Sequence, residues 1–240
     1  MGIRELKKYL EFLAFTPFHP QWLLARTNKK WVKLVTNELS GTVLDIGCGN
    51  RFLERYLRED INYIGIDYLI TATEWYHSNP DIYADAKSIP VRDESVNHVF
   101  LLDVLEHVSD PDSCLKEVKR VLENGGKLVL QVPFIYPIHD SPLDFQRWSE
   151  YGLEKLIREC GLFIKSIEPI GEPLETSGML FNISLCKYVL NAINKRNPVF
   201  FIIFLLPIII PMVNICCFIS SIIIRNDTFM PFRYRLIAEK

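Results

Sequence analysis

The sequence predicts an α/β fold in which a mostly parallel sheet carries helices on both faces. The first observation is a strand that runs into a glycine turn, residues 43–50, VLDIGCGN. The second is that strand and helix patterns alternate from residue 43 to residue 132, as they do in chains that build parallel sheets. The third is an uncharged apolar run before a final strand-like stretch, 232–240, which indicates an insertion near the end of the sheet.

The composition is that of a globular protein without a basic surface. The chain has 240 residues, of which 49% are hydrophobic and 23% charged, and its formal net charge is −2. We therefore expect no nucleic-acid partner. The six cysteines form no C-x-x-C pair and show no histidine spacing typical of zinc, so we expect no metal site. Residues 1–10 lack the apolar core of a secretory signal, which indicates a cytoplasmic protein.

Two helices are predicted before the first strand. Residues 3–15 place apolar side chains on one helical face, and Pro17 and Pro20 end that pattern. Residues 21–39 repeat it with aromatic and aliphatic side chains. We expect both helices to cover an edge of the core, with a substrate lid or a membrane-surface role as the alternative.

The turn at residues 43–50 is expected to bind a nucleotide-like cofactor. Gly47 and Gly49 allow a tight turn that presents N–H groups to a ligand, and apolar spacing over residues 52–59 predicts that a helix begins there. A dinucleotide site needs a third glycine where Phe52 stands, and the P-loop lysine is also missing. A cofactor without phosphate fits best, and a tight turn with no ligand is the alternative.

The stretch VLDIGCGN resembles the first motif of the class I S-adenosylmethionine-dependent methyltransferases. Residues 93–108, with their V-L-E-H-V run, are similar to the fourth-strand segment of the same family, in its type 11 form. The resemblance implies a Rossmann-like sheet of seven strands, in which the strand at 232–240 inserts antiparallel between the strands at 127–132 and 162–170. It also implies S-adenosylmethionine as the cofactor.

The resemblance places cofactor contacts at the ends of successive strands. Asp45 and the backbone of the glycine turn would hold the methionine part. Asp67 ends the second strand, where one carboxylate can accept hydrogen bonds from both ribose hydroxyls, and Asp85 would lie on the adenine side. The alternative for Asp67 is an acid on the surface, and the alternative for Asp85 is an acid in a loop. The expected contacts are Asp45, Gly47, Cys48, Gly49, Asp67, Tyr68, Asp85, Ala86 and Asp103.

The loop at residues 134–149, FIYPIHDSPLDFQRWS, lies where members of this family differ according to substrate. It resembles a subgroup loop, H-D/E-x-P-x-D-x-x-R-[YW]-[ST], often associated with cell-surface polysaccharide or lipid biosynthesis. If the acceptor is a hydroxyl, a base is needed, for which His139 is the first candidate and His107 the second. His107 could instead orient the following loop, and Asp144 with Arg147 could be an ion pair that shapes the loop.

Residues 199–224 carry no charged side chain and are long enough to span a bilayer. Because Pro207 and Pro211 fall near the middle, we expect a turn there, and so a hydrophobic helical hairpin that dips into or lies on the cytoplasmic membrane surface. A soluble cover, a dimer interface and a single membrane crossing are the alternatives. A single crossing would separate the strand at 232–240 from its sheet.

The patterns divide the chain into three parts. These are an N-terminal helical cover (1–40), a Rossmann-like methyltransferase domain (41–171 and 226–240) and a hydrophobic, membrane-associated insertion (172–225). The implied function is S-adenosylmethionine-dependent methylation, with O-methylation favoured, of a small-molecule or lipid-linked acceptor such as a saccharide or lipid intermediate. A non-catalytic, cofactor-binding membrane adaptor is the alternative from another class. The sequence leaves the oligomeric state open.

Overall fold

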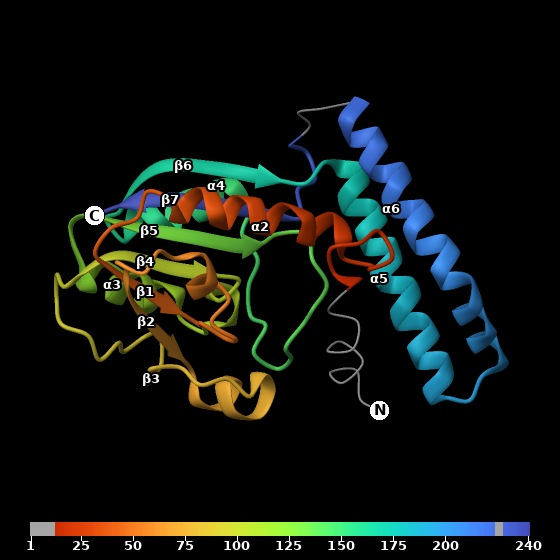
Figure 1. The fold of residues 1–240 in the computed structure, drawn as a ribbon, viewed down its shortest axis with the longest axis horizontal. Helices are drawn as coiled ribbons and strands as arrows, with labels where there is room; N and C mark the ends of the chain where they lie inside the picture. The colour runs from red at the N-terminus through yellow and green to blue at the C-terminus, as the bar shows by residue number, and fades with distance from the viewer. Residues whose placement is uncertain (1–12, 224–227) are drawn as a thin grey trace. The chain divides into compact units, whose positions relative to one another are not determined.

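The computed structural model describes residues 13–223 and 228–240 (Figure 1). The helix expected over residues 3–15 therefore lies mostly outside the described residues. The chain forms two compact units: the first combines the chain up to Trp31 with Gly171–Phe232, and the second combines Val32–Ile170 with Arg233–Lys240. Helix α2 (Trp22–Thr36) begins in the first unit and ends in the second.

A seven-stranded sheet forms the centre of the second unit (Figure 1). The first five strands in the chain pair in parallel, and the last strand, β7, lies antiparallel between β5 and β6. This arrangement confirms the predicted fold class, including the place of the final strand. In spatial order the strands are β3 (Ile82–Tyr83), β2 (Asn62–Asp67), β1 (Thr42–Ile46), β4 (Val96–Leu102), β5 (Leu122–Pro133), β7 (Arg233–Glu239) and β6 (Phe163–Ile170).

Two capped helices, α3 (Pro111–Val121) and α4 (Glu150–Glu159), pack against this sheet. The Asp110 side chain accepts a hydrogen bond from the Ser113 N–H at the start of α3, and the Ser149 hydroxyl caps α4 in the same way. Each fully buried aliphatic side chain contributes roughly 1.5 to 3 kcal/mol. Central members of this core are Leu44, Val99, Leu115, Val118, Leu128, Leu153, Ile157 and Leu236.

The prediction of a helix over residues 52–59 is wrong beyond the first turn. The structure has a single 3-10 turn there, η2 (Leu53–Tyr56), and Leu57 is already extended. Arg58 explains the early end, because its guanidinium donates to two backbone carbonyl oxygens, at residues 37 and 39, and also binds Asp60. These bonds hold the chain in a path toward β2 that does not continue the helix.

The first unit contains a helical hairpin, but its turn is not at Pro207 and Pro211, where the sequence pattern placed it. Helix α5 (Pro173–Asn194) is one arm. The other is a continuous apolar segment, η5 (Pro198–Leu205) followed by α6 (Leu206–Ile223), which lies alongside α5 (Figure 1). Within the described chain, one helical segment, residues 198–223, is long and apolar enough to cross a membrane.

The two prolines are tolerated because of where they fall. Pro207 lies in the first turn of α6, where its missing N–H is least costly. Pro211 then removes only one hydrogen bond near the start of the helix. The turn forms instead at residues 195–197, where the Asn197 side chain accepts a hydrogen bond from the Val199 N–H and caps η5.

Small and polar residues bring the two arms of the hairpin together. A Cβ at Gly178 would lie 2.5 Å from Cys217 Sγ, so glycine allows the close approach of the helices. The Asn182 amide donates to Asn214 Oδ1 at 3.0 Å, and the Asn214 amide donates in turn to the carbonyl oxygens of residues 17 and 19. Paired amides therefore tie α5, α6 and residues 17–19 into one unit.

Candidate active site

A cavity of about 480 Å³ opens beyond the carboxyl ends of β1, β2 and β4. This is where open parallel sheets bind ligands, and the volume suits a nucleoside-sized molecule. Nine of the eleven residues singled out from the sequence line it, whereas Asp45 and His139 do not. The nine are Gly47, Cys48, Gly49, Asp67, Tyr68, Asp85, Ala86, Asp103 and His107.

The glycine turn does not present its N–H groups to a ligand, contrary to the expectation from the sequence. The N–H groups of Gly47 and Cys48 both donate to the carbonyl of Ile66, and that of Gly49 donates to Asp67 Oδ2 at 2.9 Å. These bonds attach the turn to the end of β2. Both glycines have positive φ, and a Cβ at Gly49 would meet no atom within 4 Å, so the backbone lies open at that point.

Asp67 is buried, and the chain around it fixes its carboxylate. Oδ2 accepts the Gly49 N–H, while Oδ1 accepts both the backbone N–H of Tyr68 and the hydroxyl of Thr71. Since a carboxylate offers about four acceptor positions, roughly one remains for a ligand. Asp67 can therefore accept one ribose hydroxyl in this arrangement, and a contact with both hydroxyls would require one of these bonds to break.

Asp45 lies outside the cavity lining. Its carboxyl is buried and accepts a hydrogen bond from the Tyr63 hydroxyl at 2.8 Å. Burial raises the pKa of Asp45 to about 7, against the opposing effect of the Tyr63 bond, and the charge of Asp67 adds to the rise. In this position Asp45 ties β1 to β2 just before the glycine turn, and its contact with the methionine part stays a prediction.

The segment after the third strand delivers Asp85 and Ala86 to the cavity wall. Asp85 Oδ1 accepts the backbone N–H of Lys87, and its Oδ2 lies 3.6 Å from the ammonium of the same lysine. The Asp85 side chain is partly exposed, so its second oxygen can still accept a hydrogen bond from a ligand. Its contact with the adenine side stays a prediction.

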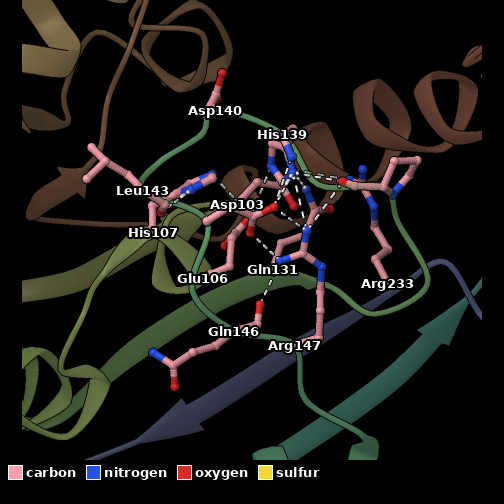
Figure 2. A network of polar contacts seen from close by, with 12 residues as sticks. Asp103, Glu106, His107, Gln131, His139, Asp140, Leu143, Gln146, Arg147 and Arg233 are labelled. Atoms are coloured by element: carbon pink, nitrogen blue, oxygen red, sulfur yellow. Dashed lines mark hydrogen bonds and ion pairs between the residues drawn. The ribbon is translucent and has the colours of Figure 1, made fainter. Parts of the chain in front are cut away.

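Asp103 is held by a chain of buried groups that the sequence did not reveal. The Gln131 amide donates to Asp103 Oδ2 at 2.8 Å, and Arg235 Nε donates to Gln131 Oε1 at 3.0 Å. Arg233 Nη1 lies 3.6 Å from Asp103 Oδ2 (Figure 2). Burial, together with the charge of Arg233, lowers the pKa of Arg235 to about 9. Asp103 Oδ1 has no hydrogen-bond partner in the described chain, and the residue has a positive φ of 57°.

Glu106, His107 and His139 converge beside Asp103 (Figure 2). Glu106 Oε1 lies 3.7 Å from His107 Nε2 and 3.8 Å from His139 Nε2, and the two imidazole rings meet edge to face at 4.8 Å. Burial, together with the charge of Asp103, raises the pKa of Glu106 well above its usual range. Burial, followed by the effect of His107, lowers the pKa of His139. The sequence pattern gave Glu106 no catalytic role.

The loop after β5 is bonded to the turn η4 (Leu105–His107), which follows β4. His107 Nδ1 bonds to the Leu143 carbonyl at 2.9 Å, and the Phe145 N–H donates to the backbone carbonyl of residue 106. The ion pair between Asp144 and Arg147 is present. The structure thus contains the ion pair and a bond from His107 to the loop, as in the two alternatives that the sequence left open, and His107 also lines the cavity.

Aromatic side chains line the mouth of the cavity, and they were not expected from the sequence. Trp75 and Tyr76 come from the π-helix η3 (Thr71–Tyr76), and Phe145 comes from the loop after β5. The Tyr76 hydroxyl donates to Asp140 Oδ2 at 2.6 Å and so joins the two segments. The available signal was a pair of aromatic residues shortly after the acid that ends β2.

Comparison with known proteins finds a match over the part of the chain that carries most of the cavity lining. A family model described as a methyltransferase domain matches residues 44–130. An S-adenosylmethionine-dependent methyltransferase from Archaeoglobus fulgidus has a similar structure, with a TM-score of 0.55 and 18% sequence identity, over 97% of this chain and 99% of that one. At that identity the likeness concerns the fold.

Two curated relatives share part of the sequence. The 2-methyl-6-phytyl-1,4-hydroquinone methyltransferase of Synechocystis is 30% identical over 163 residues, which cover 63% of this chain and 50% of the relative. An O-methyltransferase of Penicillium expansum is 28% identical over 109 residues, which cover 41% of this chain and 39% of the relative. The chain thus spans half or less of the length of these two relatives.

Proposed function

We propose that this chain, an enzyme of the class I S-adenosylmethionine-dependent methyltransferase family, transfers the cofactor's methyl group to an oxygen of a small-molecule or lipid-linked acceptor at a membrane surface. One observation carries the proposal. A single cavity joins a wall suited to a nucleoside, residues 46–87, to a second wall, residues 102–145, whose lining includes Asp103, His107, Asp140 and Phe145. We call these the cofactor wall and the acceptor wall.

The cofactor wall suits S-adenosylmethionine, the cofactor of the family. Asp67 has about one acceptor position left for a ribose hydroxyl, and Asp85 has a carboxylate oxygen for the adenine side. The N–H groups of the turn are occupied, so a contact from the turn to the methionine part would use the carbonyl oxygens of Gly47 and Gly49. Carbonyl oxygens suit the ammonium of the methionine part, as does Asp103 Oδ1, which has no hydrogen-bond partner among the described residues.

The acceptor wall would hold the acceptor in line with the sulfonium. The acceptor oxygen forms a bond to the methyl carbon, the carbon–sulfur bond breaks, and its electron pair stays on sulfur. Catalysis then depends mainly on holding the reactants in line. His107 lines the cavity and is the nearer candidate to take the hydroxyl proton, whereas His139 packs against it outside the lining. This order reverses the one favoured by the sequence.

The helical hairpin of the first unit supports the proposal that the enzyme acts at a membrane surface. The most apolar 18-residue window of Pro198–Ile223 has a mean hydropathy of 2.7, and only 11% of that window is buried. Exposed apolar side chains recur every three or four residues and so lie along one helical face. This face, the apolar stripe, consists of Phe201, Phe204, Ile208, Met212, Ile215, Ile219 and Ile222.

The connectivity favours contact from one side over a single crossing. Helix α5 follows β6, the apolar segment runs back alongside it, and β7 then pairs with β6 in the same sheet. A strand on the far side of a membrane could not make that pairing. We therefore propose that residues 172–225 contact the cytoplasmic surface of a membrane, and that residues 41–171 with 226–240 carry out the chemistry.

The curated relative from Synechocystis adds support for a lipid-linked acceptor. Its name gives a hydroquinone that bears a phytyl chain as the substrate. An acceptor of that kind, with a hydroxyl head and a long apolar chain, would reach this enzyme from a membrane. Nothing in the described chain favours the non-catalytic adaptor that the sequence left as an alternative.

The experiment that tests the acceptor class uses methyl-labelled S-adenosylmethionine. The purified chain is offered either a total lipid extract or the soluble metabolites of the same cells, and label is followed into each fraction. We expect label in the lipid fraction, in a product whose methyl group is released by ether or ester cleavage. Label confined to the soluble fraction would contradict a lipid-linked acceptor, and label on nitrogen or carbon would contradict O-methylation.

The membrane proposal is tested by flotation with vesicles of phosphatidylcholine and phosphatidylglycerol. One variant removes four side chains of the apolar stripe by changing Phe204, Ile208, Ile215 and Ile219 to serine. We expect about tenfold less of this variant to float, since these side chains no longer enter the lipid.

The matched control for flotation removes four exposed apolar side chains outside the hairpin. It changes Leu34, Tyr83, Tyr151 and Phe163 to serine. We expect this variant to float as the wild type does, because none of the four belongs to the apolar stripe. Equal flotation of both variants and the wild type would sink the proposal.

A further inference from the structure

Three side chains of the kinds that bind transition metals converge where the loop after β5 meets the end of β4. Glu106, His107 and His139 each bring one donor atom to within 4.8 Å of the others (Figure 2). The distances from Glu106 Oε1 to the two imidazole Nε2 atoms, 3.7 and 3.8 Å, are too long for hydrogen bonds. The three groups therefore face one another across a gap.

Glu106 is buried, and no side chain in the described part of the chain donates a hydrogen bond to its carboxylate. The residue is 0% exposed, and neither carboxylate oxygen has a hydrogen-bond partner in the part of the chain that the structure describes. Buried carboxylates are normally hydrogen-bonded, paired with a cation or bound to a metal. The guanidinium of Arg147, a nearby cation, is already bound to Asp144. A metal ion in the gap would give Glu106 the partner that it lacks.

The far nitrogens of both histidines face hydrogen-bond acceptors. His107 Nδ1 lies 2.9 Å from the Leu143 carbonyl oxygen, which favours the tautomer with the proton on Nδ1. His139 Nδ1 lies 3.3 Å from the Pro137 carbonyl oxygen and 3.4 Å from Asp144 Oδ2. Arg147 Nη2 also approaches this nitrogen, at 3.4 Å, but it already donates to Asp144. A carbonyl or carboxylate behind the imidazole is the usual outer shell of a metal-binding histidine.

From these observations we propose that Glu106, His107 and His139 form a binding site for a divalent transition-metal ion of the zinc type. Two imidazoles and one carboxylate leave at least one coordination position for water or substrate. The three donor atoms are separated by 3.7, 3.8 and up to 4.8 Å, so a point equidistant from them lies roughly 2.4 Å from each. Zinc bonds to nitrogen and oxygen are shorter, at about 2.0 to 2.2 Å. Small rotations of the side chains close that difference. The spacing of the cysteines and histidines gave no sign of such a site, because one ligand lies on a distant loop.

The ion would join the loop at residues 134–149 to the turn η4. Two ligands come from that turn and the third from the loop, so bound metal should stabilise the acceptor wall. Its consequence for catalysis rests on the proposed function: with both Nε2 atoms on the metal, His107 could not take the hydroxyl proton. Coordination would lower the pKa of the acceptor hydroxyl, and the proton would pass to solvent water. The site itself does not depend on that reaction.

The test measures zinc binding directly. The full chain carries Cys216→Ser and Cys217→Ser, because these adjacent thiols could bind zinc by themselves, and it is stripped with a chelator and titrated with ZnCl2 against a chromophoric chelator. We expect one zinc per chain. Glu106→Gln and His139→Gln should each weaken binding about 100-fold or more, and Asp144→Asn about 10- to 100-fold, through the imidazole that Asp144 supports.

The matched control is His77→Gln, the same substitution at an exposed histidine whose Nδ1 bonds to the Thr73 carbonyl. It should keep the affinity of the parent, and zinc should raise the Tm of parent and control but not of Glu106→Gln. Binding of S-adenosylhomocysteine shows that each variant is folded. No stoichiometric zinc, or zinc held equally by Glu106→Gln and His139→Gln, would overturn the site. Methyl transfer that persists without metal would leave the proposed function intact.

Discussion

The two walls of the cavity differ in how their buried polar groups are satisfied. On the cofactor wall, Asp67 accepts three hydrogen bonds from its own surroundings, and the N–H groups of residues 47–49 are all bound. On the acceptor side, Asp103 Oδ1 and both oxygens of Glu106 have no partner among the described residues. A buried polar group left without a partner costs about 1 to 3 kcal/mol, and a charged group costs more.

The difference indicates that the two walls reach their working state in different ways. The cofactor wall is preformed, so a ligand adds bonds to groups that are already oriented. The acceptor wall holds polar groups that have no hydrogen-bond partner among the described residues. One of them belongs to Asp103, whose backbone has the positive φ that is rare outside glycine. This wall would therefore gain most from a bound partner. A metal ion, the cofactor's ammonium and the acceptor are three partners that could supply what is missing. Four predictions test this contrast.

The largest expected effect concerns Asp45, the buried acid behind the cofactor wall. Its pKa is raised from 3.8 to about 7, so the folded chain keeps the proton at pH values where the unfolded chain loses it. The free energy of unfolding should therefore fall as pH rises from about 4 to about 7, by up to about 4 kcal/mol, and then level off. Urea unfolding at several pH values measures this dependence.

The matched variant for this measurement is Asp45→Asn, which can still accept the Tyr63 hydrogen bond. The difference in unfolding free energy between wild type and variant separates this carboxyl from the other titrating groups. We expect the variant to gain stability relative to wild type as pH rises. If the difference in unfolding free energy stayed constant across the pH range, the Asp45 carboxyl would be solvated. The cofactor wall would then not be preformed.

The next effect concerns Asp67→Ala, which removes the acceptor of the Gly49 N–H together with the proposed ribose contact. Hydrogen bonds to charged groups are worth about 1.5 to 3 kcal/mol, so affinity for S-adenosylhomocysteine should fall roughly 100-fold. Calorimetric titration measures it. Asp93→Ala, at an exposed acid paired with Arg120, should bind as the wild type does. Equal affinity in both variants would remove the ribose assignment.

The sequence was sufficient where short segments determine the structure. Glycines at 47 and 49 permit the positive φ of the turn, and Asp67 ends a buried strand, so these positions could be assigned before the sheet was known. The alternating pattern of the final strand, with the family resemblance, placed it between β5 and β6. The first success rests on local backbone chemistry, and the second rests on the family resemblance.

The rest depends on contacts between residues far apart in the chain. His139 meets Glu106 only because the loop after β5 bonds to η4, and no local spacing in the sequence reports that contact. The two arginines of β7 alternate with apolar residues as surface residues would, yet both are buried beside Asp103. The prolines at 207 and 211 indicated a turn, but their cost depends on their place in α6.

A smaller effect is expected for Gln131→Met, which removes the amide that orients Asp103 where the two walls meet. Affinity for S-adenosylhomocysteine should fall about tenfold, in keeping with the loss of one hydrogen bond to a charged group. The matched control is Gln146→Met, whose amide binds the Val108 carbonyl on the acceptor side. If the control weakens cofactor binding as much, the two walls are not independent and the contrast between them fails.

The smallest effect is expected for Tyr76→Phe, which removes a hydroxyl that joins the rims of the two walls through Asp140. A hydrogen bond between exposed groups contributes about 0.5 to 1.5 kcal/mol, so cofactor dissociation should become roughly two- to tenfold faster. Stopped-flow displacement of S-adenosylhomocysteine measures the rate. Because Phe keeps the aromatic ring of the mouth, the association rate should change little. A change confined to association would mean that this bond guides entry of the ligand and does not retain it.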